Sequence, residues 1–265
     1  AEGMGQAFAA AGGDIFGLNY NPALPALLKR SEAAIYYKRG IAEDNYGSAA
    51  FSTQLKSLTV GCNLTYYDAG SMDMINSSGI ARTVRAERDI LGTVSISTIL
   101  KKYAVGANVK VLTSELVQTA SASSLVFDLG GVAQLNKYFS SGFAVQNIGR
   151  GLKYLDERAD LPLTARFGFA FCVPAYPDTP FKAEADIVAI RGDEVPKVHT
   201  GIEWLFMEGV SLRTGYMSGY APGRWTAGMG FVQSNFTLDM AYSPSSSAGS
   251  VFDISLGYRF DYMDL

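Results

Sequence analysis

Apolar residues alternate with small or polar residues in segment after segment of this chain. From Phe252 to Phe260, every even position is apolar and every odd position is small or polar. A period of two is typical of a β-strand that has one apolar and one polar face. The pattern recurs from about residue 32 onward, and no amphipathic helix of comparable length interrupts it. The sequence therefore predicts an all-β fold.

Turn residues divide this pattern into fourteen predicted strands. They span 32–39, 45–54, 57–67, 88–98, 103–112, 123–133, 141–149, 162–172, 180–190, 196–205, 210–218, 224–233, 235–243 and 250–260. Short connections follow several even-numbered strands, whereas the connections 68–87, 113–122 and 150–161 after odd-numbered strands are longer. An even number of strands with alternating short turns and long loops is typical of a transmembrane β-barrel.

The composition favours a barrel wall in lipid over a soluble β-sandwich. Charged residues make up only 18% of the chain, below the roughly 25% of ordinary soluble domains. The polar face of the strands is rich in small residues with isolated charges, which suits the lining of a crowded lumen. Because every backbone N–H and C=O group in lipid must be paired, the sheet cannot keep a free edge. We therefore expect a closed, antiparallel, 14-stranded barrel in the outer membrane of a diderm bacterium.

The composition also argues against several classes of function. A net charge of −3 offers no electrostatic basis for binding nucleic acid. One His and two Cys are too few for a Cys/His-rich metal site. A Gly-x-Ser-x-Gly motif does not occur, and we interpret the lone His199 as a polar residue of the lumen. We expect no enzymatic activity, no cofactor and no metal.

The first thirty residues differ from the rest of the chain. They are rich in Ala and Gly and contain two prolines, Pro22 and Pro25. We expect a short helix near 4–11, followed by a compact turn region. Fourteen strands enclose more space than the side chains of the wall can fill. The sequence therefore predicts that residues 1–30 form a hatch inside the lumen and that residues 31–265 form the barrel.

Two parts of the sequence resemble a known family. The first is the start of the chain, residues 2–8 (EGMGQAF), with Asp14 and the Asn21-Pro22-Ala23 element; the second is the run VQNIG at 145–149 with LKY at 152–154 and LPLTARFG at 161–168. These segments resemble the FadL-like outer-membrane proteins, and most of all their PorV/PorQ branch. The resemblance implies a 14-stranded barrel with a short N-terminal hatch.

The resemblance implies two possible functions. In FadL-like members the barrel admits hydrophobic small molecules, whereas PorV-like members are partners of a protein-secretion machine. Short loops, a charge-rich lumen and the tail 261–265 favour a structural or interaction component of an envelope or secretion assembly. The alternative is a passive transporter of hydrophobic small molecules across the outer membrane. The expected partners are outer-membrane lipid together with either envelope or secretion proteins or hydrophobic small molecules.

The candidate binding residues of the hatch are Met4, Phe8, Asn21, Pro22 and Ala23. The Asn-Pro-Ala element has two interpretations. Proline fixes its own φ and biases the preceding residue to an extended conformation, and an Asn side chain caps such turns, so the element can be a simple turn. It can also be a hinge of the hatch that lines a ligand passage.

Strand parity places a set of charged residues on the lumen face. Unpaired buried charges are costly, so we expect these residues to form ion pairs with one another and with the hatch. A polar conduction path is the alternative that the same residues allow. The set is Arg166, Lys182, Glu184, Asp186, Lys197, Glu203, Arg213, Asp239, Asp253 and Arg259, with Lys110 and Asp128 on the same face.

Overall fold

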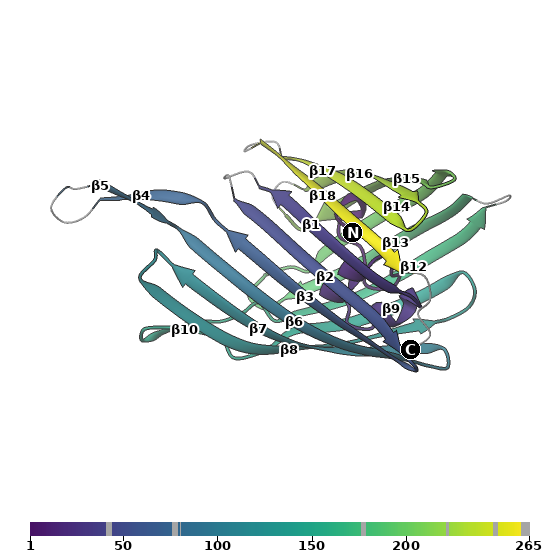
Figure 1. Cartoon of the computed structure of the whole chain (residues 1–265), viewed down its shortest axis with the longest axis horizontal. Coiled ribbons are helices and arrows are strands. Elements are labelled where there is room, and N and C mark those ends of the chain that lie inside the picture. Colours follow the sequence, from purple (N-terminus) through teal and green to yellow (C-terminus); the bar gives the residue numbers. More distant parts are fainter. Residues whose placement is uncertain are drawn as a thin grey trace.

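The computed structural model describes residues 1–40, 44–75, 79, 81–175, 179–220, 223–245 and 249–260. These residues form a closed barrel of 14 antiparallel strands, drawn in Figure 1. The expected fold class is confirmed. The tail 261–265, which favoured contact with a partner, lies outside the described residues.

The barrel strands follow one another around the wall in chain order. They are β1 Ser31–Arg39, β2 Asn45–Leu55, β3 Leu58–Asp68, β6 Glu87–Leu100, β7 Tyr103–Leu116, β8 Ala120–Gln134, β9 Phe139–Gly149, β12 Thr164–Ala175, β13 Thr179–Ile190, β14 Lys197–Met207, β15 Val210–Ser218, β16 Arg224–Gln233, β17 Phe236–Ser245 and β18 Gly249–Phe260. Pairing of β1 with β18 closes the ring. Each strand thus has two neighbours, which leaves no open sheet edge in lipid.

Two small hairpins lie in segments where the sequence predicted only loops. They are formed by β4 Ser71–Ile75 with β5 Ala81–Arg85, and by β10 Leu152–Tyr154 with β11 Glu157–Ala159. All five residues of β4 are exposed, so this strand has no buried face whose alternation could reveal it. The β4–β5 hairpin projects far beyond the wall in Figure 1. Here the expectation of plain loops was wrong, because these strands form by local pairing alone.

The wall is apolar on its outer side and polar on its inner side. On β3, Leu64 is 58% exposed, whereas its chain neighbours Asn63 and Thr65 are 3% and 6% exposed. The same alternation runs through β6, where Val94 is exposed and Thr93 is buried. This arrangement reverses that of a soluble protein and suits a wall surrounded by acyl chains. Among the described residues, no helix is long and apolar enough to cross a membrane.

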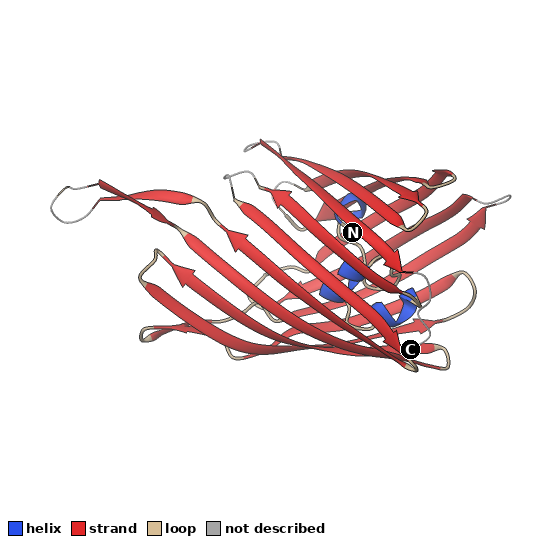
Figure 2. Ribbon diagram, in the orientation of Figure 1, coloured by secondary structure: helices blue, strands red, loops and turns tan. Residues whose placement is uncertain are grey.

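The N-terminal residues lie within the ring of strands, where Figure 2 draws the three short helices in blue. The helices are η1 Glu2–Met4, η2 Ile15–Asn19 and α1 Pro25–Leu28. Two apolar clusters hold them: Phe8 and Leu24 lie in one with Ala104 of β7, and Leu18 lies in the other with Ala34 of β1. The division between hatch and barrel at residue 30 stays a prediction, and hatch denotes residues 1–30 from here on.

The helix expected near 4–11 is wrong. Only η1 is helical there, and the chain from Ala7 to Gly13 has no regular secondary structure. The backbone N–H groups of residues 8–11 bond to carboxylates of the barrel wall instead of to carbonyls one turn earlier. A run of Ala and Gly favours a helix only when no stronger acceptors lie nearby, and here the wall supplies them.

Candidate functional site in the barrel lumen

Glycines on the lumen face let the hatch approach the wall at backbone distance. A Cβ added at Gly106, Gly130 or Gly142 would overlap backbone or side-chain atoms of Pro22, Asn21 or Ala9. The full set occupies β7, β8, β9, β12, β14, β15 and β16: Gly106, Gly130, Gly142, Gly168, Gly201, Gly215 and Gly228. The hatch therefore approaches the wall most closely along the half formed by β7–β9 and β12–β16, where larger side chains would collide with it.

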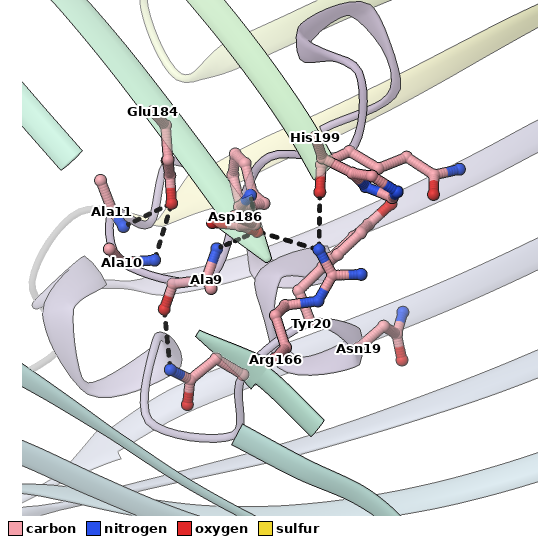
Figure 3. Close-up of polar contacts among 12 residues, drawn as sticks. Ala9, Ala10, Ala11, Asn19, Tyr20, Arg166, Glu184, Asp186 and His199 are labelled. Atoms are coloured by element: carbon pink, nitrogen blue, oxygen red, sulfur yellow. Dashed lines mark hydrogen bonds and ion pairs between the residues drawn. The ribbon is translucent and has the colours of Figure 1, made fainter. Parts of the chain in front are cut away.

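The strand β13 lies within this half and carries carboxylates in place of glycine. Asp186 Oδ2 accepts the backbone N–H groups of Phe8 and Ala9 at 2.9 and 3.1 Å. Glu184 Oε1 accepts those of Ala10 and Ala11 at 2.7 and 3.1 Å. Figure 3 shows both side chains pointing at the hatch backbone. Charge-assisted hydrogen bonds of this kind are about twice as strong as neutral ones, so β13 anchors the hatch.

Arg166 of β12 links the same anchor to a second part of the hatch. Its Nη1 donates to Asp186 Oδ2 and to the carbonyl oxygen of Gln6, both at 2.9 Å. Its guanidinium lies 5.2 Å from the ring centroid of Tyr20, within the range of a cation–π contact. Arg166 is 6% exposed and Asp186 is fully buried. Burial removes both charged groups from water, and their bonds to each other and to the hatch compensate for that cost.

A second ion-pair group spans β13 to β17. Arg213 bonds both Glu203 and Asp239. Lys182 Nζ lies 4.0 Å from Glu203 Oε1 and 5.0 Å from the ring centroid of Phe8. The structure thus brings together Lys182, Glu203, Arg213 and Asp239, in addition to the group of Arg166, Glu184 and Asp186.

Three of the expected network residues join neither group. Lys197 pairs with Asp193 in the connection before β14 at 2.8 Å. Within the described part of the chain, Asp253 and Arg259 make no ion pair, and Asp253 Oδ2 and Arg259 Nε have no hydrogen-bond partner. Parity places all ten side chains on the lumen face, but the pairing of each one depends on how the strands are staggered.

The hatch residues singled out in the sequence are deeply buried. Asn21 Nδ2 donates to the carbonyl oxygens of Ala9 and Gly131 at 2.8 and 3.1 Å, and Asn21 Oδ1 accepts the N–H of Ala23 at 3.1 Å. These bonds make the Asn-Pro-Ala element a turn that ties two parts of the hatch to β8. Met4 and Phe8 are 0% and 3% exposed. The proposed role of these residues in ligand binding stays a prediction.

A buried cluster on β7, β8 and β9 was not predicted as a site. Asp128 Oδ2 pairs with Lys110 Nζ at 2.6 Å and accepts from Asn108 Nδ2 at 2.9 Å. Asp128 Oδ1 accepts the backbone N–H of Asn147 at 2.8 Å. The β8–β9 register shifts here, and Asn147 has a left-handed φ of 62°. Only parity pointed to Lys110 and Asp128, since a bulge leaves no mark in the alternation until the two strands are paired.

A cavity of about 310 Å³ lies between the hatch and the wall strands β1, β2, β15, β17 and β18. The hatch contributes Glu2, Asp14 and Phe16 to its lining, and the wall contributes Tyr36 and Lys38 of β1, among others. None of the five hatch residues predicted to bind a ligand is among the residues that line it. The sequence signal that could have located the cavity is the inward parity of Tyr36 and Lys38, because aromatic and charged residues seldom share a packed face.

His199 of β14 is a buried polar residue of the lumen. Its Nε2 lies 3.2 Å from the hydroxyl of Tyr220, and the two rings are 5.9 Å apart. Its Nδ1 has no hydrogen-bond partner among the described residues. Within the described ranges, no carboxylate is hydrogen-bonded to the imidazole.

Replacing Gly142 with alanine tests the seating of the hatch. The new Cβ would overlap the carbonyl oxygen of Ala9 and lie 2.8 Å from the Cα of Ala10, and overpacking of this kind costs about 1–3 kcal/mol. We expect faster proteolysis of the hatch in the folded barrel. Gly61→Ala on β3 is the control, because its Cβ would meet nothing closer than 3.5 Å. Equal proteolysis rates in the two variants would contradict the seating.

The comparisons with known proteins show which solved structures share this fold. No model of a known protein family matches the sequence, and no curated protein matches it. Three solved structures are similar to it over nearly their whole length. The monoaromatic hydrocarbon channel CymD has a TM-score of 0.73 at 12% identity, with 98% of this chain and 97% of that chain covered. The Ralstonia pickettii toluene transporter TbuX has a TM-score of 0.68 at 14% identity, with 98% of this chain and 97% of that chain covered.

The third structure is a Pseudomonas aeruginosa FadL homologue, with a TM-score of 0.64 at 14% identity and 98% of both chains covered. At these identities the likeness shows the fold. That fold is the FadL-type barrel, as the sequence predicted. The PorV/PorQ branch has no counterpart among these three structures.

Proposed function

We propose that this protein is a passive transporter of small hydrophobic molecules across the outer membrane of a diderm bacterium. The observation that carries the proposal is the correspondence of fold over 97–98% of both chains with a toluene transporter and a monoaromatic hydrocarbon channel. It favours the alternative of the two functions considered from the sequence over the first. The apolar outer face of the wall supports a location among lipids.

The contents of the lumen also favour a selective passage over an aqueous pore. Hatch residues lie within the ring of strands and are held there by Glu184, Asp186 and Arg166. The space left beside them, about 310 Å³, is at the small end of the range for ligand pockets. A molecule of about one aromatic ring fits such a space.

A role as a component of an envelope or secretion assembly remains only a prediction of the sequence. The features that favoured it were short loops, lumen charges and the C-terminal tail. Arg166, Glu184 and Asp186 bind the hatch, and Lys182, Glu203, Arg213 and Asp239 pair with one another, so these charges need no protein partner. The β4–β5 hairpin, which lies in the long connection 68–87, projects beyond the wall (Figure 1), so short loops do not describe this connection.

Uptake by cells tests the proposed transport. Cells that make the protein and cells that lack it, both with an intact lipopolysaccharide leaflet, would be compared for uptake of radiolabelled ethylbenzene and of a disaccharide. We expect several-fold faster uptake of the hydrocarbon and unchanged uptake of the sugar. Unchanged uptake of the hydrocarbon would overturn the proposal. An equal increase in the uptake of the sugar and of the hydrocarbon would indicate an aqueous pore instead.

A further inference from the structure

The lumen cavity contains polar atoms that the protein leaves without partners. Asp253 of β18 is 5% exposed and lines the cavity, and its Oδ2 accepts no hydrogen bond from any described residue. Asp14 of the hatch and Tyr36 of β1 line the same cavity, and Asp14 Oδ1 and the Tyr36 hydroxyl are likewise buried without a partner among the described residues. Buried acceptors of this kind are rare in folded proteins because leaving them unpaired is costly. The carboxylate oxygens of Asp253 and Asp14 can only accept hydrogen bonds when ionised, so a ligand that donates hydrogen bonds would satisfy both.

Negative charge prevails around this cavity. Its lining contains the carboxylates of Glu2, Asp14, Asp239 and Asp253 against three cationic groups, which are the side chains of Lys38 and Arg213 and the amino group of Ala1. Arg213 is already bonded to Glu203 and Asp239.

Lys38 does not reverse this balance. It lies across from Asp253 in the β1–β18 register, with its Nζ 5.5 Å from the ring centroid of Tyr46. The charge of Lys38 therefore offsets that of one carboxylate beyond Asp239, which is already bonded to Arg213. A carboxylate ligand would meet more repulsion than attraction here, whereas a cation would meet the reverse.

Aromatic rings form the apolar part of the same cavity. The rings of Phe16 and Tyr36 are 5.8 Å apart, and those of Tyr36 and Tyr46 are 5.6 Å apart, both edge to face. Tyr20 lines the cavity as well. Such rings pack against an apolar or aromatic body and also attract a cation that lies over their faces.

We propose that the lumen cavity binds a small organic cation with an aromatic body, such as a protonated arylalkyl amine, whose N–H groups donate to Asp253 and Asp14. The aryl group packs against Phe16, Tyr36 and Tyr46. The inference rests on the proposed transport function, since it names the chemical class that the passage selects. It also distinguishes this chain from a channel for neutral hydrocarbons, which would have no use for unpaired carboxylates.

Binding of three probes of similar size tests the inference. The purified barrel in non-ionic detergent would be titrated calorimetrically with 2-phenylethylamine, 3-phenylpropanoate and ethylbenzene. We expect the amine to bind at least about tenfold more tightly than the carboxylate, which is the size that one charge-assisted hydrogen bond supplies. Equal or tighter binding of the carboxylate would overturn the inference.

Matched variants locate the effect. Asp253→Asn and Asp14→Asn should each weaken amine binding about tenfold and leave ethylbenzene binding unchanged. Asp14 belongs to the hatch, so its variant does not disturb closure of the wall if Asp253→Asn fails to fold. Asp193→Asn, in the connection before β14, should bind all three probes like the unmodified protein. If both cavity variants bind the amine as tightly as the unmodified protein does, the inference is wrong.

The cell-uptake assay, run with the same probes, separates this inference from the transport proposal. Uptake of ethylbenzene without any preference for the amine overturns the inference and leaves transport standing. Amine binding that is lost in the two cavity variants, but without uptake of any probe, supports the cavity assignment and overturns transport.

Discussion

Replacing Asp186 with alanine should lower the free energy of unfolding by about 3–5 kcal/mol, because the change leaves a buried charge without its partner. Asp186 is 0% exposed and binds Arg166 and the N–H groups of Phe8 and Ala9 through one oxygen. In the variant, Arg166 keeps only the carbonyl oxygen of Gln6 among these bonds. Urea titration of the refolded barrel in lipid vesicles measures the loss.

The same variant should also raise ion conductance in planar bilayers, because Asp186 anchors the middle of the hatch. Asp193→Ala is the matched control: its pair with Lys197 is partly exposed, and such pairs contribute about 0–1 kcal/mol. If Asp186→Ala conducts no more than the control and unfolds at the same urea concentration, the anchor has been assigned wrongly.

Replacing Val94 with arginine should destabilise the barrel in lipid by about 2–4 kcal/mol, the cost of placing that charge on the lipid face near the bilayer midplane. Val94 is 59% exposed at the middle of β6, where it pairs with Cys62 of β3 and Val109 of β7. The row of three outward side chains leaves the guanidinium no polar neighbour. The stability is read from the fraction folded in lipid vesicles over a urea series.

Met72→Arg provides the comparison for this substitution. Met72 is exposed to a similar degree, 45%, but lies on β4 in the hairpin that projects beyond the wall. We expect almost no change in stability there. Equal losses at Val94 and Met72 would mean that the outward face of β6 does not lie in the apolar part of the bilayer.

Sequence reasoning located the barrel strands well because their signal is local. The bounds of β15 and β16 are the predicted ones, and β8 extends the predicted strand by a few residues at its start. Parity also placed Asp186 and Arg213 on the lumen face. It could not show that Asp186 binds the hatch, that Arg213 joins Glu203 to Asp239, or that Asp253 is left unpaired, because each of these outcomes depends on the stagger between strands.

The sequence by itself determined which residues form strands and which side chains face the lipid, because alternation is a property of neighbouring residues. It also determined that the barrel closes, because lipid tolerates no open sheet edge. Only the tertiary structure decided how the lumen is filled and where a cavity remains. The bond that anchors the hatch joins Phe8 to Asp186 across 178 positions of the chain. No local pattern encodes a contact of that range, since it forms only when the closed wall brings β13 to face the hatch.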